Sequence, residues 1–279
     1  MLKLLKRFFE IDFDLLYVQN ISIIQRFSYI CSIYPQLVFN FFTKKNTYRI
    51  FGKRLLSDKL LTIKTFISTI YDVYWETVWL SIFDKKNPTI VDIWANIWQF
   101  AFACKYLLPE SNVISFEPNP SIFKILQENL NQYPNCELYN IWLADKDSIL
   151  DFHLSDVSSE WCSFVKPSEW NYEIIQVKAK RWDDVLKNLK EIDLMKVDVE
   201  WFEKLVLLWC EWILNNVKYL IIESSIGRTS SDLWSSDLLT YIMSKWFVVH
   251  NIGRIYGDWF AKNQWAVDIT FRNNSLFEK

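Results

Sequence analysis

The segment from Thr89 to Gln99, TIVDIWANIWQ, constrains the fold of this 279-residue chain more than any other. It begins with the apolar run Ile90–Ile93, which is interrupted by Asp92 and is typical of a buried parallel strand. The following FAFACKYLL predicts a helix that ends before Pro109. Strand, tight turn and helix in this order form the first unit of a nucleotide-binding α/β domain.

The turn in this segment carries tryptophan where glycine is expected. A strand-to-helix turn of this kind favours glycine, because its backbone takes unusual dihedral angles and lies close to a ligand. Here Trp94 and Trp98 occupy the two bends. Trp201 follows another predicted strand end, and Trp246 lies between a predicted helix and strand, where a C′ glycine is usual.

The composition supports the same contradiction. The chain has 4 glycines and 15 tryptophans, and together they make 19 of 279 residues, an ordinary glycine content of about 7%. We therefore interpret most of these tryptophans as glycines in the native protein, through translation of UGA as tryptophan where the host reads it as glycine. The alternative is a genuinely tryptophan-rich protein. UGG codons at 94, 98 and 201 would contradict our interpretation.

From Thr89 onward, predicted strands and helices alternate. The strands are expected at 89–93, 112–116, 136–141, 192–197, 217–222, 247–250 and 266–271, with a β-hairpin at 149–153 and 172–179. The helices are expected at 98–108, 121–131, 182–189, 201–214 and 232–245. This alternation predicts an α/β fold with a doubly wound, mainly parallel sheet.

The N-terminal quarter has a different pattern. Residues 1–45 predict amphipathic helices, 43–56 a short hairpin or loop, and 57–74 a further helix. We expect an N-terminal helical extension at 1–74 and the α/β domain at 75–279. Polar residues within 21–42 argue against a membrane-spanning helix. A cytoplasmic protein is predicted; a peripheral membrane contact through MLKLLKRFF is the weaker alternative to helices that pack on the domain.

Charge and metal-ligand content exclude several classes of function. The net charge is −2 and no basic stripe is visible, so nucleic acid is not an expected partner. Five cysteines without a C-x-x-C pair and two histidines predict neither a disulfide framework nor a zinc site. The oligomeric state is left open.

Two features at the predicted carboxyl ends of strands point to an adenosine cofactor. The loop Trp94–Ala95–Asn96–Ile97–Trp98 leads into a helix N-terminus, which favours a negative group. Glu117 follows the next strand about 20 residues on, where an acid receives two ribose hydroxyls. The alternative for Glu117 is a strand-end carboxylate exposed to water.

With glycine at the bends, D-I-G-A-N-I-G resembles the first motif of class I S-adenosylmethionine (SAM) methyltransferases. VDIWANIWQFA, ISFEPNPSIFKILQENL, IWLADKD and above all IDLMKVDVEWFEKLVLLWCEWIL then resemble FkbM-type SAM-dependent methyltransferases, over about residues 50–272. The resemblance implies a seven-stranded Rossmann-like methyltransferase sheet. It implies that SAM is held by Asp92, the 94–98 loop, Glu117 and Asn119, with Ala144 and Asp145 near the adenine. Asp145 is equally well interpreted as a turn residue. Tryptophans retained at 94 and 98 would block the cofactor loop.

Asp198 and Glu200, beyond the fourth strand, are the predicted catalytic pair that orients the acceptor or accepts its proton. A structural ion-pair set of Lys196, Asp198 and Glu203 is the alternative. Asp198 with Glu223 is too small a ligand set to predict a metal. We expect O-methylation of a sugar, glycan or other small hydroxyl acceptor. The competing functions are an NAD-type dehydrogenase and a non-catalytic Rossmann-like binding module.

Overall fold

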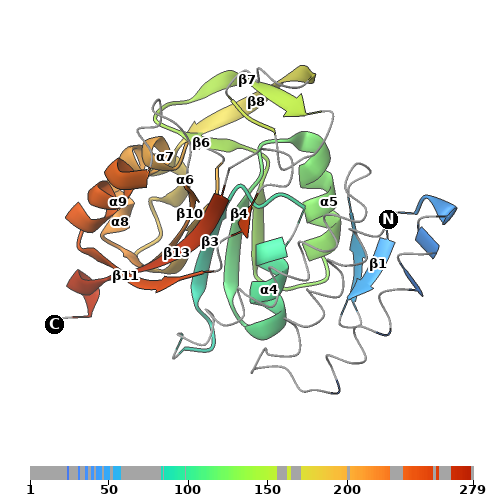
Figure 1. Cartoon of the computed structure of the whole chain (residues 1–279), viewed down its shortest axis with the longest axis horizontal. Helices are drawn as coiled ribbons and strands as arrows, with labels where there is room; N and C mark the ends of the chain where they lie inside the picture. The colour runs from blue at the N-terminus through green and yellow to red at the C-terminus, as the bar shows by residue number, and fades with distance from the viewer. Residues whose placement is uncertain are drawn as a thin grey trace.

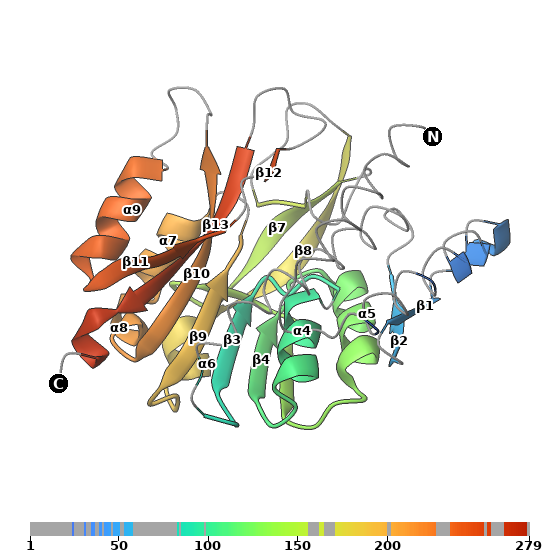
Figure 2. The same cartoon turned by 60° about the horizontal axis from the view of Figure 1, so that its bottom comes forward.

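A sheet with a path of seven strands runs through the centre of the molecule (Figures 1 and 2). The structure is a computed structural model, and it describes residues 83, 85–97, 99–155, 162–164, 171–199, 202–226, 235–253, 256–257 and 265–277, with 24, 31, 35–36, 39–40, 42–45, 47–50 and 53–57 nearer the N-terminus. The helices predicted over 1–45 and 57–74 lie almost wholly outside these residues.

The strand order of the central sheet is β11-β13-β10-β9-β3-β4-β5. The strands are β3 (Thr89–Ile93), β4 (Asn112–Phe116), β5 (Cys136–Tyr139), β9 (Ile192–Val197), β10 (Val217–Ile226), β11 (Phe247–Ile252) and β13 (Trp265–Asn273), with the short β12 (Tyr256–Gly257) paired to β13. Pairing is parallel from β5 to β10, whereas β13 is antiparallel to both β10 and β11. The predicted α/β fold with a mainly parallel sheet is confirmed.

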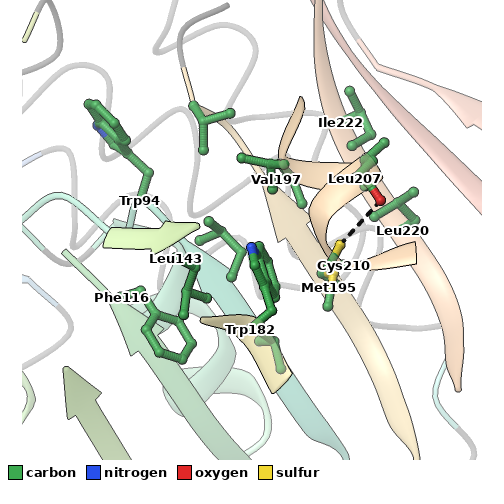
Figure 3. Packing of buried hydrophobic residues seen from close by; sticks show 14 of the residues in the cluster. Trp94, Phe116, Leu143, Trp182, Met195, Val197, Leu207, Cys210, Leu220 and Ile222 are labelled. Atoms are coloured by element: carbon green, nitrogen blue, oxygen red, sulfur yellow. Dashed lines mark hydrogen bonds between the residues drawn. The ribbon is translucent and has the colours of Figure 1, made fainter. Parts of the chain in front are cut away.

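Helices cover both faces of this sheet, which is why its parallel strands are mostly apolar. Helices α4 (Gln99–Leu107) and α5 (Pro120–Leu130) pack on the face that carries Ile90, Val113 and Leu194. Helices α6 (Trp182–Leu186), α7 (Glu203–Trp209), α8 (Glu211–Leu214) and α9 (Ser235–Ser244) pack on the other face, in a cluster partly shown in Figure 3. The single helix predicted over 201–214 is wrong, because the chain leaves helical geometry at Cys210.

A three-stranded sheet lies beyond the carboxyl ends of the central strands (Figure 2). Its order is β6 (Trp142–Ala144), β8 (Tyr172–Arg181), β7 (Ser148–Ser155), and the antiparallel β7–β8 pair is the predicted hairpin. The strand predicted over 136–141 ends instead at Tyr139. The next residue, Asn140, turns its amide to the carbonyls of Glu117 and Pro118, at 2.8 and 3.0 Å, and β6 starts after it.

The N-terminal hairpin β1 (Thr47–Ile50) and β2 (Lys53–Leu56) shares the core of the α/β domain. Tyr48 and Leu55 are buried in the cluster beneath α4 and α5. The Asn129 side chain of α5 accepts a hydrogen bond from the Leu56 N–H and donates to the carbonyls of Leu56 and Ile97. One buried amide therefore joins the hairpin to the loop after β3. The predicted boundary at residue 74 stays a prediction.

Two tryptophans have the backbone conformation of glycine. Trp94 has φ 72° and Trp246 has φ 68°, within the left-handed region. Side chains with a Cβ enter this region at a cost, and a bulky residue there is a rare exception. Both positions are ones where the local sequence predicts glycine. Trp209 and Trp212 lie within α7 and α8, and Trp98 and Trp201 lie outside the described residues.

Trp246→Gly is expected to raise the free energy of unfolding by about 1 kcal/mol, because it removes a Cβ from a left-handed position at the end of a helix. The indole that is lost is 68% exposed and contributes little packing. Urea denaturation followed by circular dichroism measures the change.

Trp212→Gly provides the matched control for that substitution. The same replacement inside α8 is expected to lower the free energy of unfolding by about 1 kcal/mol, since glycine is a poor helix former. Equal losses in the two variants would contradict the interpretation of Trp246.

Candidate functional site

Main-chain hydrogen bonds join the loop after β3 to the end of β4. The N–H groups of Trp94 and Ala95 both donate to the carbonyl of Phe116, at 3.0 and 2.9 Å. Asn96 follows with φ 52°, so the loop contains two left-handed residues within three positions. Main-chain hydrogen bonds therefore set its shape.

Glu117 holds this loop to the turn between β4 and α5. Its side chain is 2% exposed; Oε2 accepts from the Asn96 N–H at 3.0 Å and Oε1 from the Asn119 N–H at 2.7 Å. Burial raises the pKa of Glu117 to about 8, against the two hydrogen bonds that lower it, and Asp92 raises it further. The alternative of a carboxylate exposed to water is wrong. Ribose binding stays a prediction. It is compatible with the two hydrogen bonds of Glu117, because each carboxylate oxygen keeps a second lone pair.

The other predicted cofactor residues surround this loop. Asn119 caps α5 through its Oδ1, which accepts from the Ser121 N–H at 3.0 Å. Ala144 is buried at the end of β6, and Asp145 after it is exposed. Trp142 of β6 contacts the Trp94 ring edge-on at 5.5 Å, so β6 lies against the loop. Trp98 lies outside the described residues.

Asp92 is buried completely, and neither carboxylate oxygen has a hydrogen-bond partner. Burial raises the pKa of Asp92 to about 7; Lys196 opposes this shift and Asp198 adds to it. Lys196 is the neighbour of Asp92 on β9 in the strand register. Burial of a carboxyl group without a hydrogen-bond partner lowers the stability of the fold, and such groups concentrate at functional sites.

Asp198 lies two residues beyond Lys196 and is paired with it, Nζ to Oδ2, at 2.8 Å. Burial raises the pKa of Asp198, but the Lys196 charge and hydrogen bonds from Glu223 and Lys196 outweigh burial and hold it below its usual value. The ion pair of the structural alternative is therefore present, and its carboxylate is also 28% exposed. Glu200, the second predicted catalytic residue, lies outside the described residues.

Asp268 is a further residue of this site, and the sequence did not predict it. This residue lies opposite Glu223 in the antiparallel pairing of β13 with β10. Burial raises the pKa of Asp268 to about 6, and Asp198 adds to the shift while Lys196 opposes it. Only the strand register, and no motif, brings it to this site. In the described part of the chain, no group of three or more His, Cys, Asp or Glu side chains is arranged to hold a metal ion.

The sheet order and this loop define a Rossmann-like α/β fold. A family model for the methyltransferase FkbM domain matches residues 92–237, slightly more than half of the chain. The chain belongs to the FkbM methyltransferase family.

Two curated relatives and one solved structure illustrate the similarity. The chain is 27% identical over 162 residues to the 2-O-methyltransferase NoeI of Sinorhizobium fredii, covering 52% of this chain and 67% of that protein. It is 24% identical over 152 residues to the hexuronic acid methyltransferase AglP of Haloferax volcanii, covering 53% and 61%. The structure of a methyltransferase FkbM from Methylobacillus flagellatus aligns with a TM-score of 0.46 at 16% identity, over 77% of this chain and 56% of that one.

The polar residues around the loop fit SAM, whereas the side chain of Trp94 does not. Asp92 has free carboxylate oxygens, and Glu117 and Asn119 lie at the next strand end. The Trp94 indole, however, is 7% exposed and packs against Trp142, Phe152 and Phe164, with ring centroids 5.5, 5.5 and 6.1 Å away. It fills the space between the loop and the three-stranded sheet.

No helix among the described residues is long and apolar enough to cross a membrane.

The stability of the protein is expected to fall between about pH 5 and pH 8. In the folded state Asp92 and Glu117 keep their protons to about pH 7 and 8, whereas in the unfolded chain carboxyls lose them near pH 4. Rising pH therefore favours the unfolded state through this window. Asp92→Asn should increase the free energy of unfolding, relative to the parent, by roughly 1–4 kcal/mol more at pH 8 than at pH 5.

Urea denaturation at the two pH values measures this difference. Asp151→Asn serves as the control, because Asp151 is exposed on β7 and removes the same charge from the surface. A pH-independent effect of Asp92→Asn would show that Asp92 is ionised at both pH values.

Proposed function

We propose that the protein is a SAM-dependent O-methyltransferase that acts on a hydroxyl of a sugar, glycan or other small acceptor. The observation that carries the proposal is the fastened loop after β3, with Glu117 on one side and Asp198 at the neighbouring strand end. Membership of the FkbM methyltransferase family supports methyl transfer. The names of the two relatives, a 2-O-methyltransferase and a hexuronic acid methyltransferase, support a sugar oxygen as the acceptor.

SAM supplies a methyl group on a sulfonium sulfur, and the acceptor oxygen displaces that sulfur in line. The chain must position the two reactants and take up the hydroxyl proton. Asp198 suits this task, because Lys196 keeps its pKa low and so keeps it ionised as a hydrogen-bond acceptor. Glu200 remains a proposed partner from its place in the sequence.

We further propose that glycine stands at position 94, and by the same argument at 98, in the active protein. The φ of 72° at Trp94 supports this for position 94, as does the packing of its indole against the three-stranded sheet. The main-chain bonds from Trp94 and Ala95 to Phe116 do not need the indole. A glycine chain would therefore keep the same turn and leave space beside it.

The chain with glycine at 94 and 98 is expected to bind SAM at least about tenfold more tightly than the tryptophan chain, because the loop is then open to the ligand. Calorimetric titration with SAM and with NAD measures the affinity. Peptide mass mapping of protein from the native source, across residues 89–105, establishes which residue the cell uses.

Alanine at 94, with glycine at 98, is the matched control. It removes the indole but keeps a Cβ at a left-handed φ, so SAM binding should fall between the other two chains. Binding of NAD alone would favour the dehydrogenase, and binding of neither ligand would favour the non-catalytic module. Tryptophan at 94 in native peptides would refute the glycine proposal.

Asp198→Asn in the glycine chain is expected to lower the rate of methyl transfer by about 100-fold or more, since amide oxygen does not take the proton. The affinity for SAM should change by less than about threefold, because we assign Asp198 to the acceptor and not to the cofactor. Transfer of labelled methyl groups to a panel of methyl glycosides gives the rate, and Asp151→Asn is the charge-matched control. A loss of SAM affinity with an unchanged rate would assign Asp198 to the cofactor.

A further inference from the structure

A row of polar residues crosses the α4 side of the central sheet. In the strand register, Asp92 of β3 lies between Ser115 of β4 and Lys196 of β9; Lys196 is followed by Ile221 of β10, and Ile221 by Thr270 of β13. One layer nearer the amino ends, the same face is apolar, with Val113, Ile90, Leu194 and Tyr219. The face thus changes from apolar to polar as it approaches the carboxyl ends of the strands.

Most of this row has no hydrogen-bond partner. The hydroxyls of Ser115 and Thr270 and both carboxylate oxygens of Asp92 are buried without one, and each of these residues is fully buried. Buried polar atoms are nearly always paired in native proteins. An unpaired set on one face, at the strand ends where α/β sheets bind ligands, points to a polar ligand.

One layer nearer the carboxyl ends of the strands, the residues are acidic just after β9 (Asp198), on β10 (Glu223) and on β13 (Asp268). Asp198 and Lys196 are paired at 2.8 Å, and Glu223 lowers the pKa of Asp198 through a side-chain hydrogen bond. Asp268 lies opposite Glu223, and it is close enough to Asp198 for that charge to raise its pKa. Thr270 lies two residues along β13 from Asp268 and hence on the same face.

We propose that Asp198, Glu223 and Asp268 form the acceptor site above Thr270, and that the acceptor is a neutral or amino-substituted polyol, not a uronate or a phosphorylated sugar. Asp268 is assigned as a specificity-determining residue, and it lies outside the 92–237 match to the family. This inference rests on the proposed methyl transfer to a sugar hydroxyl.

Carboxylates accept hydrogen bonds from neighbouring hydroxyls, and Lys196 offsets only part of the negative charge. At pH 8 this group of residues has a net negative charge, because Asp92 and Asp268 have then lost their protons. An acceptor anion would be repelled at short range in a partly buried site, whereas an ammonium group would be attracted.

The test uses the full chain with glycine at 94 and 98, saturated with S-adenosylhomocysteine, at pH 8. The probes are methyl glycosides of hexoses, hexosamines and hexuronic acids in matched gluco, galacto and manno configurations, and saturation-transfer NMR ranks their affinities. We expect the best neutral or amino glycoside to bind at least about tenfold more tightly than its uronate. Asp268→Asn should reduce that ratio several-fold, and Asp268→Glu should restore it.

Controls separate this inference from the proposed function. Glu128→Gln removes an exposed carboxylate from α5 and should leave the ratio unchanged. Glu223→Gln is the independent second variant and should reduce the ratio as Asp268→Asn does. Uronates that bind as tightly as neutral glycosides, or a ratio that both variants leave unchanged, would overturn the inference while methyl transfer stands. A chain that binds no SAM would overturn the proposed function itself.

Discussion

The buried Glu117 carboxylate is the interaction on which the cofactor end of this fold depends. Its two oxygens accept hydrogen bonds from the N–H groups of Asn96 and Asn119, which belong to different loops. Loss of the carboxylate would leave two N–H groups unpaired, at a cost of about 1–3 kcal/mol for each that stays buried. Because Asn119 also caps α5, the position of that helix depends on the same bond.

The two faces of the central sheet differ in polarity near the carboxyl ends of the strands. On the α6–α9 side, the residues of β3, β4 and β9 remain apolar up to the strand ends, as in Ile93, Phe116 and Val197. On the α4 side, the corresponding layer carries Asp92 and Lys196. Burial of such charged groups lowers the stability of the fold. The fold tolerates this loss because the α6–α9 face, and the part of the α4 face nearer the amino ends of the strands, are continuous apolar core.

Much of this fold could be predicted from the sequence, because buried parallel strands such as Ile192–Val197 are short, mostly apolar segments with turn residues after them. The end of β5 at Tyr139 could not, since it depends on a tertiary bond from Asn140 to the β4–α5 turn. The break at Cys210 has no proline or glycine beside it in LLWCEWIL as the sequence is printed. Asp268 was missed for a similar reason: Glu223 and Asp268 are 45 positions apart, and only the antiparallel return of β13 makes them neighbours.

The glycine-like dihedrals at residue 94 follow from forces that do not involve its side chain. The N–H groups of Trp94 and Ala95 converge on one carbonyl, and Asn96 is held by Glu117, so the backbone between β3 and α4 is fixed at three successive residues. The indole packs into the aromatic cluster of Trp142, Phe152 and Phe164. Ring contacts in this cluster offset the backbone strain of the left-handed φ at Trp94. A turn that keeps its shape with the bulkiest side chain is a turn whose shape was set by its main chain. That is the behaviour expected where glycine is the residue the fold requires.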